Sequence, residues 1–389
     1  MRLMRLMRHI GLIGLMGLMG CSSDEEQAPT TAVQVMGYVA GFDEAQKAQK
    51  AYEPYKAHEA YRAYAPATRA WLPPSGYSLF GDHKVGICFT QDSQEPKLGH
   101  FFKSGSEWRT SVDITSGDYY LYGYAPHTSG LSCEITDLDG TAGDAGIYSN
   151  GAILKIKNVP TVTASDLCVV IGAKNGKDDY EPDPTDYEVT GLQRGDFAYT
   201  ATGSDNNYVY LLFDHLFSAM RINIRVNGEY DALRTIKLRG IYLQTSDGTT
   251  MNTSKTDITV TLEKTTNGAD PISRIDYEAK GDDVGNGIIY ESTAGETLGT
   301  AYTTFLCHFM PQDVNTLIMT CVYDIYDKNG NLIRQDCEAT NTLEISELFS
   351  GQVAARRGSR YTINMTIQPT YLYMLSEPDL NNPTVTVEE

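Results

Sequence analysis

One cysteine near the N-terminus has the sequence context that lipid attachment requires. Three arginines occur within the first eight residues, an apolar run follows over residues 10–19, and Cys21 comes directly after a glycine. These are the features of a lipoprotein signal, and so short an apolar run cannot cross a roughly 30 Å hydrocarbon core as a helix. We therefore predict a signal peptide over residues 1–20, lipidation of Cys21 and a location at the outer membrane or cell surface.

Two peptide bonds downstream of Cys21 are typical substrates of an arginine-specific protease. Arg62 and Arg69 are each followed by alanine, at the end of a stretch rich in alanine and lysine. Charged, low-complexity segments often have no fixed fold, and exposed tethers are preferred sites of proteolysis. We expect residues 21–69 to form a tether that contains one short strand, over residues 32–39. Cleavage at either arginine is compatible with the sequence.

The remaining reactive residues form no catalytic pattern. The sequence contains no Gly-x-Ser-x-Gly, His-Glu-x-x-His, phosphate-loop or dinucleotide-binding glycine motif. His215 follows Asp214, but no nucleophile lies near it in sequence, so we interpret His215 as a structural histidine. We therefore do not predict an enzyme and expect no cofactor.

The cysteines other than Cys21 are widely spaced and form no Cys-x-x-Cys pair, so the sequence predicts no metal site. Several lie in apolar, strand-like runs, where a buried free thiol is the ordinary interpretation. Disulfides remain open for an exported protein, but the sequence does not indicate which residues would pair. These cysteines are Cys88, Cys133, Cys168, Cys307, Cys321 and Cys337.

Composition limits the fold and the partners. The chain has 389 residues, enough for two domains, and a formal net charge of -19. Such a charge repels phosphate backbones, which makes nucleic acid an unsuitable partner. Abundant tyrosine and threonine, together with alternating apolar residues, favour β-structure. We expect an all-β protein with one domain over residues 70–204 and a second over residues 205–389.

Several segments should form the strands that build these domains. The aromatic segment 118–125 is assigned to the first domain, and segments 208–213 and 221–226 are assigned to the second. Lys328-Asn329-Gly330 lies between two strand patterns, and Asn-Gly in that context predicts a tight hairpin. Residues 361–368 alternate apolar and polar, which predicts a central strand of the second domain.

The C-terminal tail is unusually apolar for a chain end. Two short segments, 371–375 and 384–387, have strand-like patterns, and each needs a partner sheet in its own domain or in a neighbouring molecule. An edge hairpin folded back on its own domain is the simpler of the two interpretations. The apolar or aromatic residues concerned are Tyr371, Leu372, Tyr373, Met374, Leu375, Val385 and Val387.

Taken together, these segments resemble the fimbrillins of Bacteroidales, the type V pilins and their fimbrillin-like relatives. The resemblance rests on the cysteine signal with the acidic residues that follow it, on Thr68 to Pro74, and on Trp108-Arg109 leading to Tyr119 to Pro126. It continues through Asp214 to Ala219 and Tyr361 to Tyr373. These segments span almost the whole chain, and none of them is a catalytic motif.

The resemblance implies two tandem β-sandwich domains of transthyretin-like type, preceded by a lipoprotein signal and tether. It also implies assembly by strand exchange. An arginine-specific protease would cut at Arg69-Ala70 and release the first strand, and the C-terminal strands of a neighbouring subunit would fill the groove. The expected partners are other pilin subunits, that protease, the outer membrane through the lipid, and a glycan or protein receptor.

A second interpretation keeps the chain uncut. The protein would then be an unprocessed surface lipoprotein that acts as a pilus anchor or as a glycan-binding adhesin, with the tyrosine-rich strands supplying stacking surfaces. The sequence does not distinguish a stalk, tip or anchor position. Retention of the lipid on a full-length chain would favour this second interpretation.

Overall fold

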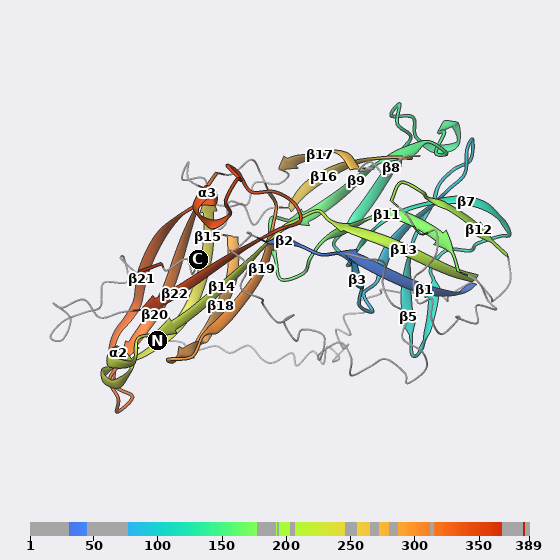
Figure 1. Cartoon of the computed structure of the whole chain (residues 1–389). Coiled ribbons are helices and arrows are strands. Elements are labelled where there is room, and N and C mark those ends of the chain that lie inside the picture. Colours follow the sequence, from blue (N-terminus) through green and yellow to red (C-terminus); the bar gives the residue numbers. More distant parts are fainter. Residues whose placement is uncertain are drawn as a thin grey trace, which may run out of the picture.

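In the computed structural model, most of the described residues form β-strands, and these strands are arranged in two lobes (Figure 1). The described residues are 31–44, 77–176, 192, 194–202, 207–245, 255–264, 272–279, 287–311, 315–367 and 384–385. The all-β class is confirmed, whereas the tandem transthyretin-like arrangement stays a prediction. No helix among these residues has the length and apolar character needed to span a membrane.

A nine-stranded sheet forms most of the first lobe. Its strand order is β11-β13-β1-β6-β5-β4-β7-β12, with β3 pairing β1, and β11 also pairs β7, so that the strands close into a ring. The strands are β1 (Thr31–Ala40), β3 (Tyr77–Leu79), β4 (Val85–Thr90), β5 (Lys97–Ser104), β6 (Glu107–Thr110), β7 (Gly117–Ala125), β11 (Cys168–Asn175), β12 (Ala198–Ala201) and β13 (Asn207–His215).

A second sheet covers one side of this ring. Its order is β17-β16-β9-β8, and its strands are β8 (Ser132–Thr136), β9 (Gly151–Pro160), β16 (Lys255–Glu263) and β17 (Ile272–Ala279). One apolar cluster lies between the two sheets and includes Tyr122, Leu154 and Val260. A separate cluster, which includes Phe89, Leu121 and Phe213, fills the interior of the ring. The first lobe therefore has two cores.

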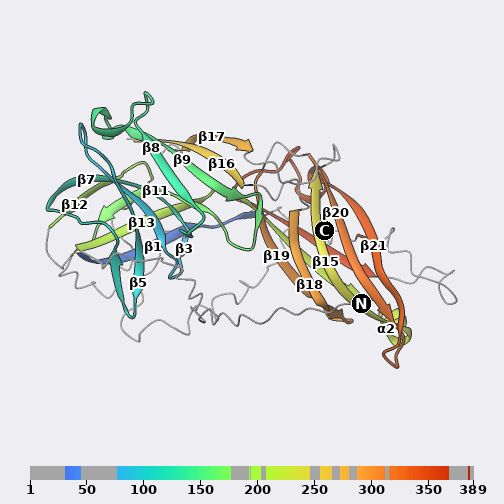
Figure 2. The ribbon, with the colours of Figure 1, turned by 180° about the vertical axis from the view of Figure 1, so that it is seen from behind.

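Two further sheets form the second lobe, which Figure 2 shows from behind. They enclose a single apolar cluster that includes Ile222, Leu238 and Ile363. One sheet runs β10 (Val162–Thr163), β19 (Thr303–Phe309), β14 (Ser218–Val226), β22 (Ser359–Ile367) and β2 (Asp43–Glu44), with β23 (Thr384–Val385) also on β22. The other runs β18 (Gly287–Leu298), β15 (Thr235–Thr245), β20 (Thr316–Tyr326) and β21 (Leu332–Glu344).

The helical elements among the described residues are short. They are the 3-10 turn η2 (Gly143–Ala145) and the helices α2 (Gly228–Leu233) and α3 (Ile345–Leu348). Asn227 begins α2 as an N-cap, because its side-chain oxygen accepts a hydrogen bond from the backbone N–H of Glu229.

The sheets divide the chain differently from the boundary expected between residues 204 and 205. The segment 208–213, assigned to the second domain on its pattern, lies in β13 and pairs β1 and β11 in the first lobe. Strands β16 and β17, which come after β14 in sequence, also belong to the first lobe. Alternation predicts a strand with one buried face, but it does not say which sheet receives that face.

Two local predictions are confirmed. Strands β20 and β21 pair as the hairpin expected around Asn329 and Gly330, and Gly330 has a φ of 83°. Strand β22 lies between β14 and β2, and its alternating Tyr361, Ile363 and Met365 are buried. Every cysteine except Cys21 lies among the described residues, and each of these cysteines is a free thiol.

Candidate functional site

The N-terminal strand β1 is enclosed by strands from later parts of the chain. Residues 33–39 pair in parallel with β13, from Val33 opposite Asn207 to Val39 opposite Phe213. On the other edge, Tyr38–Ala40 pair antiparallel with β3, and Thr31–Ala32 pair with β6. The strand expected over residues 32–39 is confirmed, and Figure 1 shows it in blue beside β13. It is an interior strand rather than an extension of the tether.

Side chains of β1 enter both cores of the first lobe. Val33 is 1% exposed and belongs to the cluster inside the ring, with Val35 and Val39 partly buried against that cluster. Tyr38 is fully buried in the cluster between the two sheets, where Met36 also packs. Because side chains alternate across a strand, one short segment helps to fill two cores. Removing β1 would leave two apolar surfaces and two strand edges open.

Gly37 allows β1 to come close to its neighbours. A Cβ atom at this position would lie 2.7 Å from Cε2 of Phe213 and 3.0 Å from Cβ of Phe80. The rings of Phe80 and Phe213 stack with centroids 4.5 Å apart, so the space is already filled. A larger residue at position 37 would therefore displace packed aromatic rings.

After β1, the chain crosses from the first lobe to the second. Backbone N–H of Asp43 donates to the carbonyl oxygen of Gly358 at 2.7 Å, and β2 pairs in parallel with the start of β22. The guanidinium of Arg360 lies 5.0 Å from the centre of the Phe42 ring. The described N-terminal segment thus contacts both lobes.

His215, at the end of β13, contacts this crossing segment. Its Nε2 lies 2.7 Å from the carbonyl oxygen of Ala40, and its ring stacks on Phe42 with centroids 3.7 Å apart. Its Nδ1 lies 2.6 Å from Oδ2 of Asp166. Because both ring nitrogens face oxygen acceptors, both contacts are hydrogen bonds only when the imidazole carries two protons. His215 therefore joins β13 to the N-terminal segment and to the residues that precede β11.

Cys168 completes a buried cluster with Asp166 and His215. Its Sγ lies 3.4 Å from Oδ2 of Asp166 and 3.7 Å from Nδ1 of His215. Burial, together with the Asp166 carboxylate, raises the pKa of the Cys168 thiol well above its usual range. Burial also raises the pKa of Asp166, but the hydrogen bond from His215 and the charge of its ring outweigh that effect and lower it overall.

This cluster does not have the geometry of a nucleophilic triad. In a triad, the carboxylate orients the histidine through one ring nitrogen while the other nitrogen faces the nucleophile. Here Asp166 and Cys168 both approach Nδ1, and Nε2 is occupied by the carbonyl of Ala40. The thiol is also fully buried. In this arrangement, His215 cannot accept a proton from Cys168 on one ring nitrogen while Asp166 holds the other nitrogen, as a triad requires.

Asp214 is next to His215 in sequence, but its carboxylate does not contact the His215 ring. Its Oδ2 accepts hydrogen bonds of 2.8 Å from both Arg194 and Arg357. Its Oδ1 accepts from the backbone N–H of His215. The carboxylate that contacts the His215 ring is Asp166, which is far from it in sequence. Sequence reasoning missed this partnership because adjacent residues of a strand point to opposite faces.

The two ends of the described chain share β22 as a partner. Strand β2 pairs with Ser359–Arg360, and β23 pairs antiparallel with Met365–Thr366, where Val385 is opposite Met365. For Val385 the structure thus agrees with a tail folded back on its own chain. The other expected donor residues, Tyr371, Leu372, Tyr373, Met374, Leu375 and Val387, lie outside the described residues. So do Cys21, Arg62, Arg69 and Ala70.

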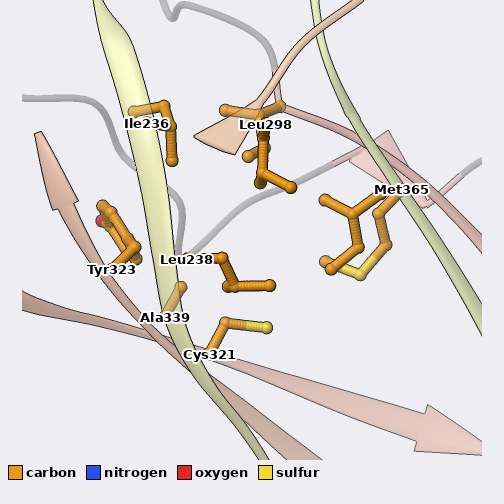
Figure 3. Close-up of a pocket in the computed structure, with 9 residues that line it drawn as sticks. Ile236, Leu238, Leu298, Cys321, Tyr323, Ala339 and Met365 are labelled. Atoms are coloured by element: carbon orange, nitrogen blue, oxygen red, sulfur yellow. The ribbon is translucent and has the colours of Figure 1, made fainter. Parts of the chain in front are cut away.

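A small cavity lies in the core of the second lobe (Figure 3). It has a volume of about 20 Å³ and is lined by apolar side chains from facing sheets, including Leu238, Cys321 and Met365. Ligand sites usually enclose hundreds of Å³ and carry a few directed polar groups. This cavity is a packing gap between the two sheets and not a binding site.

The tyrosines of β7 do not form an exposed stacking surface. Tyr119, Tyr122 and Tyr124 are 3%, 0% and 2% exposed. The hydroxyl of Tyr122 donates to the carbonyl of Tyr148 at 2.7 Å, and the hydroxyl of Tyr124 contacts His127. The expectation that these tyrosine-rich strands supply glycan-stacking surfaces is therefore wrong for these three residues, because Tyr119 lies in the cluster inside the ring and Tyr122 and Tyr124 lie in the cluster between the two sheets.

Comparison with known proteins finds likenesses only among solved structures. No family model and no curated protein matches the chain. A Bacteroides fragilis protein to which a cell-adhesion role has been ascribed is 12% identical, with 91% of this chain and 96% of that chain covered at a TM-score of 0.41. A Bacteroides ovatus protein ascribed the same role is 11% identical, with 92% and 96% covered at a TM-score of 0.35. A fimbrial protein from Bacteroides ovatus is 9% identical, with 88% and 50% covered at a TM-score of 0.31. These values do not assign the chain to a family.

Proposed function

We propose that this protein is a structural subunit of a cell-surface fimbria that is exported as a lipoprotein and assembled by strand exchange. In this proposal, proteolysis after Arg69 frees β1 from the rest of the chain. When β1 leaves the first lobe, a strand from a neighbouring subunit takes its place. The assembled fimbria serves adhesion at the cell surface.

The observation that carries the proposal is the position of β1 in the first lobe. The strand pairs with β13 on one edge and with β3 and β6 on the other, and it contributes side chains to two cores. It is nevertheless separated from β3 by residues 41–76, which include both Arg62 and Arg69. A single cut in that segment makes a central strand into a separate peptide held only by noncovalent contacts.

Burial energies explain why such an exchange needs both a cut and a replacement strand. Fully burying a valine, methionine or tyrosine-sized side chain contributes roughly 1.5–3 kcal/mol. Val33 and Tyr38 are fully buried, and Met36, Val35 and Val39 are partly buried. The loss of β1 therefore costs on the order of 5–10 kcal/mol of gross burial, which an incoming strand with the same alternation would recover.

The donor in this proposal is the apolar C-terminal tail of a neighbouring subunit, over residues 371–375 and 384–387. Residues 371–375 are apolar or aromatic at every position, so as a strand they present apolar side chains on both faces, as a groove with two apolar faces requires. Among the described residues, Val385 pairs with Met365 of the chain's own β22. In this proposal, the tail leaves that pairing when the groove of a neighbouring subunit becomes available.

The test is the mature N-terminus of the native protein. Intact-mass analysis and N-terminal sequencing of protein from the cell surface should give a chain that begins at Ala70. Arg69→Ala should abolish both this processing and the polymer ladder on denaturing gels, whereas the matched Arg62→Ala variant should retain both. A full-length chain with a lipidated Cys21 would overturn the proposal. That result would favour an unprocessed surface lipoprotein acting as anchor or adhesin.

A further inference from the structure

We propose that Asp166, Cys168 and His215 form a zinc-binding site at the junction between the start of β11 and the end of β13. Their ligand atoms, one from each residue, all lie within 4.8 Å of one another. The site goes beyond the proposed function. Its three residues lie outside the removable strand, but Ala40 and Phe42 of the N-terminal segment contact His215, so the inference concerns the uncut chain. It also differs from the absence of a metal site that the cysteine spacing predicted.

The distances match most of a tetrahedral zinc site. Typical bonds of zinc to sulfur, nitrogen and oxygen place neighbouring ligand atoms roughly 3.3–3.6 Å apart. Sγ of Cys168 lies 3.7 Å from Nδ1 of His215 and 3.4 Å from Oδ2 of Asp166. The third edge, from Nδ1 to Oδ2, is 2.6 Å because it is a hydrogen bond. Only this edge must lengthen, by less than about 1 Å, when a metal replaces the bridging proton.

The surroundings of His215 are those of a metal-binding histidine. Such a histidine usually donates its second ring N–H to a carboxylate or backbone carbonyl, which fixes the tautomer and the ring orientation. The Nε2 of His215 already lies 2.7 Å from the carbonyl oxygen of Ala40, and Phe42 stacks against the ring. When Nε2 keeps its proton, the lone pair of Nδ1 points toward Cys168 and Asp166.

The donor set selects the metal. One thiolate, one imidazole and one carboxylate suit zinc, whereas calcium and magnesium require mainly oxygen ligands. On binding, the Cys168 thiol and Nδ1 of His215 each release one proton to solvent, and the divalent charge balances the thiolate and the carboxylate. The side chain of Asp166 is 23% exposed, and in this proposal a water molecule from that side supplies the fourth ligand.

The experiment uses cobalt(II) alone as a spectroscopic substitute for zinc in the purified full-length protein. About one Co²⁺ per chain should bind and produce a thiolate-to-cobalt charge-transfer band together with the intense visible bands of tetrahedral coordination. Added Zn²⁺ should remove both signals. The absence of a thiolate band at saturating Co²⁺ would overturn the proposal.

Matched variants identify the ligands. Cys168→Ser should lose the charge-transfer band, while Cys307→Ser should keep it, because Cys307 is equally buried but lies in the second lobe with burial alone acting on its thiol. Asp166→Asn preserves the side-chain shape and should lose the tetrahedral spectrum, which keeps the test valid if a cysteine variant misfolds. Unchanged spectra in both Cys168→Ser and Asp166→Asn would place the metal elsewhere and reject this site.

Discussion

The two lobes hold the ends of the described chain in different ways. In the first lobe, β1 lies between strands on both edges and enters two cores. In the second lobe, the described part of the tail, Thr384–Val385, pairs with one edge of β22. The comparison shows that a strand near a chain end can contribute to a lobe in two ways. It can pair on both edges and fill a core, or it can pair on one edge of a sheet that is already formed. We therefore expect the first lobe to depend on β1 more than the second lobe depends on β23.

The difference comes from how each lobe is built. The closed ring of the first lobe takes strands from residues 31–40, 77–125, 168–175 and 198–215, so one missing strand opens the ring. The second lobe is built around one core between two sheets, which β14, β15, β20 and β22 fill from the interior of the sequence. We therefore expect a strand at its edge to matter less to that core than β1 matters to the ring.

The largest effect should follow from Tyr38→Ala in β1. The side chain is fully buried, and truncation of a buried aromatic residue costs about 3–5 kcal/mol. Chemical denaturation followed by tryptophan fluorescence measures this loss in the first lobe, because Trp108 lies in β6 and belongs to the cluster inside the ring. The matched control is Val353→Ala in the second lobe, where Val353 is 74% exposed. That control should shift the unfolding free energy by less than about 0.5 kcal/mol.

Deletion of residues 384–389 tests how much the protein depends on β23, for comparison with its dependence on β1. The tryptophan transition of the first lobe should remain in place, because β23 pairs with the second lobe. A loss as large as that of Tyr38→Ala would contradict the distinction between the two terminal strands.

A smaller effect should separate two glycines that matter for different reasons. Gly37→Ala places a methyl group 2.7 Å from the buried Phe213 ring, and overpacking of this kind costs about 1–3 kcal/mol. Gly330→Ala meets no atom within 4 Å, but its φ of 83° is strained for alanine, at a cost of about 1 kcal/mol. Denaturant midpoints of the two variants provide the comparison. If Gly37→Ala were the milder substitution, β1 would be less tightly enclosed than the contacts indicate.

The smallest effect should appear as a pH dependence of the first lobe. Burial, with smaller contributions from the charges of His100 and Lys84, lowers the pKa of His127 to about 4. A histidine with a lowered folded-state pKa binds fewer protons when folded than when unfolded, so stability falls as the pH drops from about 6.5 to about 4. The loss should not exceed about 2 kcal/mol, because partial exposure screens the charge.

His127→Gln should remove this part of the pH dependence while keeping a polar partner for Tyr124, whose hydroxyl lies 2.8 Å from Nδ1 of His127. Tryptophan-monitored denaturation at pH values across that window measures the slope. An unchanged slope in His127→Gln would assign the acid sensitivity to another group.

Local order was predictable from the sequence wherever neighbouring residues decide it. Alternation identified β1, β14 and β22, and Asn329-Gly330 identified the hairpin between β20 and β21. These features depend on the side-chain period of a strand and on the backbone freedom of a turn, which act over a few residues. The candidate strand in the tether was found in this way, although its place inside the first lobe was not.

Contacts between distant residues were not predictable in the same way. Asp214 was the sequence neighbour of His215, but Asp166 and Cys168 supply the atoms that reach its ring. Likewise, β13 and β16 have patterns that suit either lobe, and only pairing with β1 and β9 assigns them to the first. Such outcomes depend on which strand edges meet, and a single sequence does not contain that information.

The amino-acid sequence by itself determined the β-rich class and the positions of the strands with the clearest apolar and polar alternation. It also determined the negative net charge and the wide spacing of the cysteines. Tertiary structure alone decided that β1 is a strand of a closed ring, that Tyr119, Tyr122 and Tyr124 of β7 are buried, and that Asp166, Cys168 and His215 converge. The physical reason is range. Periodicity and turn chemistry act between residues close in sequence, whereas burial and ligand geometry arise only when strands far apart in the chain are brought side by side.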